Sequence, residues 1–241
     1  MGFDGKRILI TGASKGIGWA TARHLASLGG HVVALGRNRD DLDALATEIG
    51  CDVLDVDLEH PSAAHDAMQA AGPVDLLVNC AGLAIVQTAL ATSAATFDRV
   101  MAVNCRAPML LSQIYAQDRI GRGLGGAIVN VSSVASFKGT PDHAAYCASK
   151  AALDALTRVM AHEWGVHKIR VNGVHPVITL TPMATQVWSD PAKSDPVKAR
   201  IPLGRFVEPE EVAHAIAYLL SDQAAMISGI DLPVDGGFLI A

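Results

Sequence analysis

Short, continuously apolar runs recur along the chain, and they constrain its fold more than any other feature. Between them lie segments whose apolar residues follow helical spacing, for example residues 18–29, 39–50 and 93–117. Strands that are apolar on both sides are buried on both faces, which is typical of parallel sheets. We therefore predict an α/β fold of the Rossmann type, with one doubly wound parallel sheet of about seven strands and helices on both faces. The predicted strands are residues 7–11, 31–36, 51–56, 75–79, 126–132, 169–174 and 230–235.

The chain of 241 residues is long enough to bury one large core, and we predict a single domain over residues 1–241. The longest segment without a recognisable helix or strand covers residues 176–207. Connections of that length in a compact domain usually carry function. We expect this segment to close over a substrate as a lid.

The composition argues against several classes of partner. A net charge of −5 does not suit nucleic-acid binding, which needs a basic face. No run approaches the roughly 18 apolar residues of a membrane span, and the strand that begins at Arg7 leaves no room for a signal peptide. The four cysteines form no C-x-x-C pair and the histidines show no metal-binding spacing. We therefore expect no metal, no membrane partner and a cytoplasmic location.

The first predicted strand leads directly into the glycine-rich sequence TGASKGIG, residues 11–18. Such a turn brings backbone N–H groups and a helix N-terminus to a phosphate, where the helix dipole favours an anion. We expect a dinucleotide pyrophosphate here, and the alternative is a glycine-rich turn that binds nothing. The candidate contacts are Gly12, Ser14, Lys15, Gly16, Ile17 and Gly18.

The end of the second predicted strand indicates which dinucleotide is bound. Enzymes that use NAD usually place a carboxylate there for the 2′-hydroxyl of the ribose. This chain has Gly36 and Arg37 instead, and Lys15 in the glycine loop points to the same neighbourhood. Because a guanidinium binds phosphate in a fork geometry, we expect NADP(H) with Arg37 near its 2′-phosphate. The alternative is that Arg37 is a solvated residue at the start of a helix.

A tyrosine and a lysine, Tyr146 and Lys150, lie four residues apart in the alanine-rich sequence AAYCASKAAL. Alanine favours helix, so both side chains are expected on one helical face. Taken alone, the pair is best explained as a surface tyrosine stacked on a solvated lysine, because such pairs are common on helices. Ser133 follows the fifth predicted strand and precedes Tyr146 by 13 residues. Ligands of doubly wound sheets bind beyond the carboxyl ends of the strands, which is where these three residues are expected.

Five motifs in order make the chain resemble the short-chain dehydrogenase/reductase family over essentially its full length. They are TGASKGIG, NCAG at residues 79–82, VNC with Asn104, SS with Ser133, and YCASK with Tyr146 and Lys150. The resemblance implies a catalytic tetrad of Asn104, Ser133, Tyr146 and Lys150. It also implies an oxidoreductase that transfers a hydride between a nicotinamide cofactor and a carbonyl compound.

The chemistry of carbonyl reduction fits these residue types. The developing alkoxide needs a proton, and Tyr146 is the expected donor, although the pKa of a free tyrosine is near 10. We expect the Lys150 ammonium to lower that pKa and also to bind the nicotinamide ribose. The Ser133 hydroxyl is expected to contact the substrate and to stabilise the alkoxide, as an oxyanion hole does. By resemblance, Asn104 holds a water that replenishes the proton.

The resemblance also implies further cofactor contacts, at the adenine, the adenosine ribose and the nicotinamide. In that order they are Asp57 and Leu58, then Asn79, Ala81 and Gly82, then Pro176, Thr179 and Thr181 together with Tyr146 and Lys150. Two places depart from the family pattern. Cys80 stands where an asparagine is usual, and His175 and Val177 flank Pro176 where the family has N-P-G. A small buried thiol is a tolerable substitute, whereas the loss of the glycine argues against a backbone contact with the cofactor at that position.

Within the family, the chain resembles the L-xylulose reductases, also called dicarbonyl reductases, in segments such as GPVDLLVN, HKIRVN, WSDP and RIPLGRF. This implies an NADPH-dependent reductase of small dicarbonyls and ketoses that acts as a homotetramer. His143 and Trp188 correspond in position to substrate-side residues of that subgroup. A structural histidine and a tryptophan that only packs the lid are the alternatives.

The chain ends in the apolar residues Phe238, Leu239 and Ile240, which we expect to be exposed in a monomer and covered by a neighbouring subunit.

Two other functions stay open. One is a sugar-alcohol dehydrogenase that works mainly in oxidation with NAD. The other is a dinucleotide-binding scaffold without activity. The intact set of Ser133, Tyr146 and Lys150 argues against the scaffold, which has no need of it.

Overall fold

Seven parallel strands form the central sheet of the protein. The computed structural model describes residues 2–241, apart from the side chains of Met183, Gln186 and Val187, and in that part of the chain the strand order is β3-β2-β1-β4-β5-β6-β7. The order reverses between β1 and β4, which confirms the predicted doubly wound sheet. The strands are β1 (Arg7–Thr11), β2 (His31–Gly36), β3 (Asp52–Asp55), β4 (Leu76–Asn79), β5 (Gly126–Val131), β6 (Ile169–Pro176) and β7 (Asp231–Val234).

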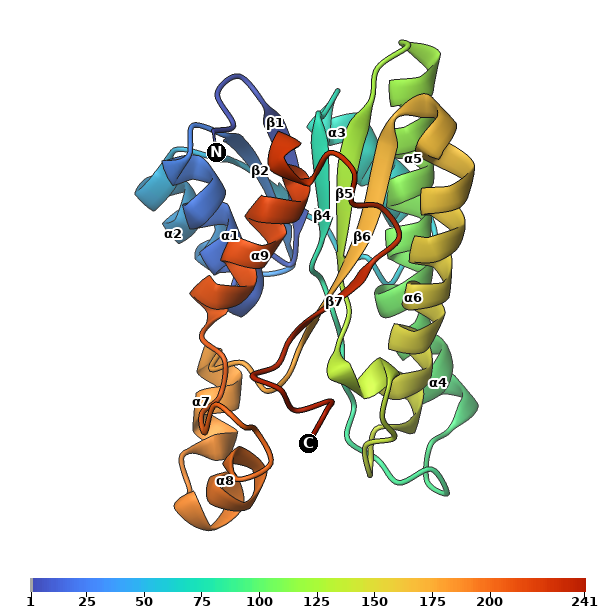
Figure 1. Ribbon diagram of the computed structural model, residues 1–241. Helices are drawn as coiled ribbons and strands as arrows, with labels where there is room; N and C mark the ends of the chain where they lie inside the picture. Colours follow the sequence, from blue (N-terminus) through green and yellow to red (C-terminus); the bar gives the residue numbers. More distant parts are fainter. Residues whose placement is uncertain (1) are drawn as a thin grey trace.

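Helices cover both faces of the sheet (Figure 1). Helices α1, α2 and α9 pack on one face, and α3, α5 and α6 pack on the other. The helices are α1 (Gly16–Ser27), α2 (Arg39–Ile49), α3 (Ala63–Ala71), α4 (Ala94–Met101), α5 (Ala107–Gly121), α6 (Ala144–Trp164), α7 (Pro182–Trp188), α8 (Pro191–Lys198) and α9 (Pro209–Leu220), with short helical turns η1 (Ala102–Arg106), η2 (Val134–Ser136), η3 (Gly165–His167) and η4 (Asp222–Ala224).

The two apolar layers explain why the strands read as continuous apolar runs. In β1, Ile8 and Ile10 belong to the buried cluster under α1 and α9, whereas Leu9 belongs to the cluster under α3 and α5. All three are fully buried, because successive side chains of a strand point to opposite faces and both faces are covered.

The helices differ from the prediction in two respects. Helices α3 and α9 are not among the predicted elements, although Glu208 and Glu211 form a capping box at the start of α9 and mark a helix start in the sequence. The helix predicted over residues 93–117 is interrupted by the π-helical turn η1, which separates α4 from α5. Within the described residues, no helix is both long and apolar enough to cross a membrane.

The prediction that the segment 176–207 lacks helices is wrong. It contains α7 and α8, each of which has a proline in its first turn. The Thr181 hydroxyl and the Asp190 carboxylate cap these helices by accepting hydrogen bonds from backbone N–H groups. A capping residue followed directly by proline is a helix-start signal, so the sequence carried this information. In Figure 1, α7 and α8 project from the same end of the molecule at which the chain terminates.

The C-terminal tail is folded onto the protein, which corrects part of the expectation for it. Phe238 and Leu239 are half-buried against the core, and only Ile240 of the three is strongly exposed, at 90%. Lys138 Nζ donates a hydrogen bond to the Phe238 carbonyl oxygen at 3.0 Å. Two cations lie near the Phe238 ring, Lys138 Nζ at 4.9 Å and the Arg200 guanidinium at 5.0 Å from the ring centre. The tail therefore links the loop before α6 to the end of the lid.

Candidate active site

The carboxyl ends of the parallel strands bring the predicted site residues to one edge of the sheet. The glycine loop follows β1, Arg37 follows β2, and Ser133 follows β5. Asn79 and Pro176 are the last residues of β4 and β6. Because all strands are parallel, these ends share one edge, and residues distant in sequence meet there.

The glycine loop is packed too closely to accept side chains at its three glycines. A Cβ atom at Gly18 would overlap the carbonyl oxygen of Gly12, and one at Gly12 would lie 2.7 Å from the Cα atom of Ala81. Gly12 and Gly16 also have positive φ angles of 70° and 57°, which favour glycine. A Cβ atom at Gly16 would lie 2.7 Å from the methyl group of Thr181, so the loop contacts the start of the lid.

The N-terminus of α1 has the features of an anion site. Its N-cap residue, Lys15, is extended, and no side chain within the described chain caps the helix. The N–H groups of the first turn at Gly16, Ile17 and Gly18 are therefore uncapped, and the helix dipole adds partial positive charge there. Ser14 lies against the end of β2, since a Cβ atom at Gly36 would be 3.1 Å from its side chain. This arrangement fits the pyrophosphate of a dinucleotide.

The two cations predicted at the 2′-phosphate each have a carboxylate neighbour. Lys15 Nζ lies 2.9 Å from Asp41, and Arg37 Nη1 lies 3.9 Å from Asp57. Both cationic side chains are more than half exposed, at 63% and 56%. Ion pairs of this exposure are weak, so both cations can turn to a phosphate.

Leu58 and the NCAG motif lie close to the sheet. Leu58 is buried. The Asp57 carboxylate accepts a hydrogen bond from the Glu59 N–H at 3.0 Å. The Thr11 hydroxyl accepts hydrogen bonds from the backbone N–H groups of Cys80 and Ala81, both at 3.0 Å. This contact fixes Ala81 and Gly82 beside the glycine loop.

The Asn79 side chain is turned into the protein. It is buried, and its Nδ2 donates to the Ser112 hydroxyl at 3.1 Å and to Asn130 Oδ1 at 2.8 Å. Its amide therefore ties β4 to β5 and α5. Any contact of Asn79 with a ribose would have to come from its backbone.

Ser133 and Tyr146 come together from two different elements. Ser133 follows β5 in an extended conformation, and its Oγ accepts a hydrogen bond from the Ala135 N–H at 3.1 Å. Tyr146 lies in the first turn of α6, with its side chain near Ser133. Burial raises the pKa of Tyr146, and the nearby Ser133 hydroxyl offsets part of that effect. The phenol is therefore protonated at neutral pH.

Lys150 lies one turn further along α6 and is buried. Its Nζ donates to the Val131 carbonyl oxygen at 2.8 Å and lies 5.7 Å from the centre of the Tyr146 ring. Burial lowers the pKa of Lys150 to about 8. The expectation that Lys150 lowers the pKa of Tyr146 is wrong for this structure, because burial raises it and the ammonium is directed to a backbone carbonyl.

Asn104 occupies the π-helical turn η1 and is fully buried. Its Oδ1 accepts from the Leu83 N–H at 2.7 Å, and its Nδ2 donates to the Leu83 carbonyl at 2.8 Å and to the Ser149 hydroxyl at 3.0 Å. The amide thus joins the loop after β4 to α6. π-Helical turns often occur at functional sites, but the side chain is committed within the protein, and a water held by Asn104 stays a prediction.

The two candidate substrate residues have different surroundings. His143 is the N-cap residue of α6, and its ring centre lies 6.1 Å from that of Tyr146. Its Nδ1 lies 2.7 Å from the Pro141 carbonyl oxygen. Trp188 ends α7 and packs edge-on against Phe206 with 5.7 Å between ring centres. His143 therefore lies beside Tyr146. Trp188 makes the packing contact expected of a residue that stabilises the lid.

The segment after β6 returns to the glycine loop. Pro176 and Thr179 are buried, and Thr179 forms an isolated parallel bridge with Val207. Thr181 caps α7 and contacts Gly16. The two ends of the lid are thus fixed to each other, and its first end is fixed to the glycine loop.

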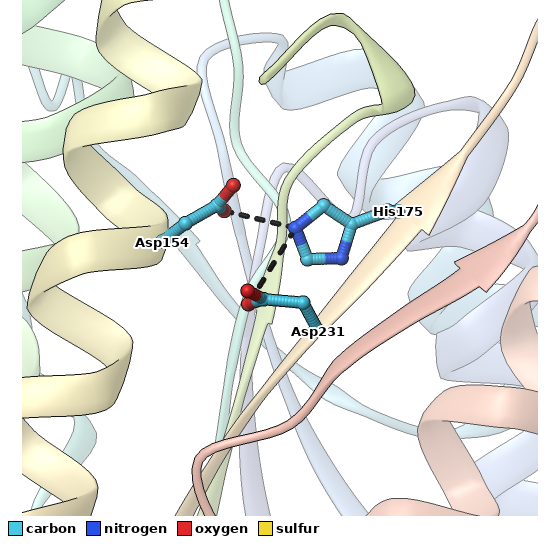
Figure 2. A group of neighbouring side chains, drawn as sticks. All are labelled: Asp154, His175 and Asp231. Carbon is cyan, nitrogen blue, oxygen red and sulfur yellow. Dashed lines mark hydrogen bonds and ion pairs between the residues drawn. The ribbon is translucent and has the colours of Figure 1, made fainter. Parts of the chain in front are cut away.

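A cluster of three residues beneath this site, of which Asp154 and His175 are buried and Asp231 is partly exposed, is absent from the sequence predictions. His175 Nε2 lies 2.9 Å from Asp154 Oδ1 and 3.8 Å from Asp231 Oδ1. Figure 2 shows Asp154 from α6 and Asp231 from β7 directed at the same nitrogen of His175 on β6. The only sequence signal is His175 itself, which departs from the family pattern beside Pro176. The two carboxylates have no sequence relationship to it, so only the fold could reveal them.

Comparison with known proteins places the chain among dehydrogenases and reductases. A family model described as "Enoyl-(Acyl carrier protein) reductase" matches residues 12–239. The L-xylulose reductase of Mesocricetus auratus is 48% identical over 100% of this chain and 99% of its own length. A protein of Sus scrofa named carbonyl reductase [NADPH] 2 is 45% identical over 99% of this chain and 98% of its own length.

Solved structures agree with this relationship. A 4-hydroxyisoleucine dehydrogenase complexed with NADH has a TM-score of 0.94 at 34% identity and covers 98% of this chain and 99% of its own. A protein of Beutenbergia cavernae, described as an NAD(P)-dependent gluconate 5-dehydrogenase with bound NADP at low occupancy, has a TM-score of 0.95 at 34% identity and covers 100% of this chain and 99% of its own. The chain therefore belongs to the short-chain dehydrogenase/reductase family and is an oxidoreductase that depends on a nicotinamide cofactor.

Proposed function

We propose that the protein reduces the carbonyl group of a small dicarbonyl or ketose, of the diacetyl or L-xylulose type, with NADPH as cofactor. The observation that carries the proposal is that Ser133 lies near enough to Tyr146 to lower its pKa, with Lys150 Nζ 5.7 Å from the tyrosine ring. Two hydroxyl groups and a buried amine therefore lie together at the carboxyl edge of the sheet. The names of the L-xylulose and carbonyl reductase relatives support the substrate class.

A reduced nicotinamide cofactor, when bound, supplies the hydride. The Ser133 and Tyr146 hydroxyls both donate hydrogen bonds to the substrate carbonyl oxygen and polarise it. Tyr146 then gives up its proton as negative charge develops on that oxygen. Because burial raises the pKa of Tyr146, the phenol is protonated throughout the neutral range and is prepared for reduction. Lys150, whose ammonium is buried beside the tyrosine, would hold the ribose of the cofactor.

We assign the dinucleotide to the open N-terminus of α1 and to the groups around it. The uncapped N–H groups of Gly16, Ile17 and Gly18 would bind the pyrophosphate. Lys15 and Arg37, both more than half exposed, would bind a 2′-phosphate. His143, beside Tyr146, and Trp188 on the lid are the proposed substrate contacts.

A second candidate is an NAD-dependent sugar-alcohol dehydrogenase that works mainly in oxidation. The observation that favours it is the pairing of both candidate cations with carboxylates, Lys15 with Asp41 and Arg37 with Asp57. Such carboxylates could accept a hydrogen bond from a free 2′-hydroxyl and would repel a 2′-phosphate. The relative complexed with NADH is consistent with this reading.

We also propose a homotetramer in the cytoplasm. The resemblance to the L-xylulose reductases supports this assembly, and so does the chain end, where Ile240 is 90% exposed. Exposed apolar side chains at a chain end suit a contact between subunits.

Initial rates decide between the two functions. The purified protein should be assayed with diacetyl, L-xylulose and xylitol, each with both nicotinamide cofactors. The proposal expects kcat/KM with NADPH to exceed that with NADH by about tenfold or more, with reduction favoured at neutral pH. Equal rates with both cofactors, or turnover of xylitol with NAD alone, would favour the second candidate. No turnover with any of the three compounds and either cofactor would overturn both.

A further inference from the structure

The cluster beneath the active site is connected to Lys150 through α6. Lys150, Asp154 and Arg158 follow one another at four-residue intervals, so their side chains share one face of the helix. Lys150 and Asp154 are 3% and 4% exposed. Arg158 Nη1 lies 2.6 Å from Asp231 Oδ2, and Asp231 Oδ1 faces His175. The charges on this face alternate, and Asp154 stands between the two cations.

Asp154 is held in place by His175, whose Nε2 lies 2.9 Å from its Oδ1. Ser132 and Ser136 lie near enough to lower the pKa of the carboxyl group, although their hydroxyls donate to the backbone carbonyls of Lys150 and Ser133. Because both groups that face His175 Nε2 are carboxylates, that nitrogen carries a hydrogen and donates it to Asp154. These donors, with burial opposing them, hold the pKa of Asp154 below its ordinary value. Asp154 is therefore a carboxylate throughout the neutral range.

Asp154 is also the carboxylate that acts on Lys150. Burial disfavours the Lys150 ammonium, and two groups counter it, the Cys80 thiol and Asp154. Burial raises the pKa of Cys80 to about 12, so at neutral pH this thiol is uncharged and offers no counter-charge. Tyr146, the other ionisable group that faces Lys150, is a neutral phenol there. Among the described groups that act on Lys150, only Asp154 is negatively charged at neutral pH.

We infer that Asp154 and His175 are positioning residues for Lys150, with His175 fixing the carboxylate that keeps the lysine charged in its buried position. The inference rests on the proposed role of Lys150. Two further groups face His175, the Asp231 carboxylate and the Phe137 ring, whose centre lies 4.9 Å from that of the imidazole. Asp231 is itself paired with Arg158, so it serves the far end of the cluster rather than Lys150.

The test is the pH dependence of kcat/KM for NADPH in the variant Asp154→Asn. Asparagine keeps the shape of the side chain and still accepts a hydrogen bond from His175, but it removes the charge. In the wild type we expect kcat/KM to fall as the pH rises through about 8, where Lys150 loses its proton. Without the carboxylate the ammonium is less favoured, so this fall should move to lower pH by about one unit. The dissociation constant for NADPH should rise over the same pH range.

Asp231→Asn is the matched control, because it removes one charge from the same cluster at the end remote from Lys150. It should lower thermal stability and leave the pH of the fall unchanged. If Asp154→Asn does not fold, two variants of His175 provide the same test. His175→Gln retains a hydrogen-bond donor to Asp154, whereas His175→Leu removes it. We expect the leucine variant to shift the fall in the same direction as Asp154→Asn, and the glutamine variant to restore the wild-type profile.

Three results would overturn the inference. One is equal pH profiles for wild type and Asp154→Asn, and another is an equal shift in Asp231→Asn. The third is a stoichiometric metal in the purified protein whose removal by EDTA reproduces the Asp154→Asn profile, since the three donor atoms lie within 4.8 Å of one another. Lys150→Met separates this inference from the proposed function. If that variant keeps full activity and NADPH affinity, the role proposed for Lys150 fails; if it is inactive while Asp154→Asn behaves as wild type, only the inference fails.

Discussion

Lys150 Nζ lies 5.7 Å from the centre of the Tyr146 ring, one helical turn away on α6. Lys150 is buried and Tyr146 is half-buried, and burial shifts their pKa values in opposite directions. It raises the pKa of the tyrosine and lowers that of the lysine. In each case burial favours the neutral form. At neutral pH Tyr146 is therefore a phenol, and Lys150 is an ammonium that loses its proton near pH 8.

Tyr146→Phe removes the proposed acid and should abolish turnover. Loss of a general acid typically costs about 10² to 10⁴ in rate, whereas cofactor affinity should stay within a few-fold. Steady-state rates and NADPH fluorescence titration measure the two effects. Tyr115→Phe is the matched control: the Tyr115 hydroxyl donates to the Asp75 carbonyl oxygen far from this edge, so that variant should lose stability and keep kcat. If Tyr146→Phe keeps more than about a tenth of wild-type kcat, another group is the acid.

Lys150→Met should lose activity and gain stability. The pKa of Lys150 lies near 8 in the folded protein, below its ordinary value of 10.5, so the unfolded chain binds this proton more tightly. The buried charge therefore costs folding free energy at pH 7, by at most about 3 kcal/mol. Part of this gain is offset in the variant because the Val131 carbonyl loses its donor.

The pH dependence of this difference checks its origin. Between pH 8 and 10.5 the wild type sheds the proton on folding, so its stability rises and the gap to the variant should close. Urea unfolding at pH 7 and pH 10 measures the gap. A gap that is absent at pH 7, or that widens with pH, would show that the buried ammonium is not its cause.

Arg37→Asp should change the preference between the two cofactors. A carboxylate at this position repels a 2′-phosphate and can accept a hydrogen bond from a free 2′-hydroxyl. We expect the KM for NADPH to rise by about tenfold or more and the KM for NADH to stay unchanged or fall. Arg122→Asp, which breaks an exposed ion pair with Asp118 just beyond α5, makes the same charge change away from the site and should alter neither. Equal losses with both cofactors would show that Arg37 serves folding instead.

Gly18→Ala should unfold or strongly destabilise the glycine loop. The added methyl group would overlap the Gly12 carbonyl oxygen, which is backbone and cannot turn aside. We expect a loss of NADPH binding and of several kcal/mol in unfolding free energy. Gly121→Ala is the control, because nothing lies within 4 Å of its added Cβ in the last turn of α5. That variant should gain up to about 1 kcal/mol, and similar behaviour of the two variants in thermal unfolding would contradict the packing argument.

Removal of residues 238–241 should loosen the lid. The truncation takes away the Phe238 ring, which contacts Lys138 and Arg200, and the carbonyl group that accepts a hydrogen bond from Lys138. We expect the KM for the carbonyl substrate to rise more than the KM for NADPH. Light scattering on the same samples tests the proposed tetramer. An intact assembly with an unchanged substrate KM would show that the tail serves neither purpose.

The sequence alone was sufficient to predict the doubly wound parallel sheet and the strand ends that carry the site residues. The apolar runs predict the strands because each strand is buried on both faces, and that burial leaves a local and periodic trace. The glycine loop and the spacing of Tyr146 and Lys150 are also local: one is a tight turn before a helix, and the other is a single helical turn. Patterns of this kind can be read without knowing what lies across the sheet.

The tertiary structure decided everything that depends on neighbours from other elements. Asp154, His175 and Asp231 come from α6, β6 and β7 and meet only because β5, β6 and β7 lie side by side and α6 covers them. The direction of the pKa shift at Tyr146, the inward turn of Asn79 and the packing of Phe238 likewise follow from which atoms surround these side chains. Desolvation and hydrogen bonding are set by those surroundings, whereas periodicity records only which face of an element is buried. For this reason the sequence could name the catalytic residues it expected, and only the fold could show what supports them.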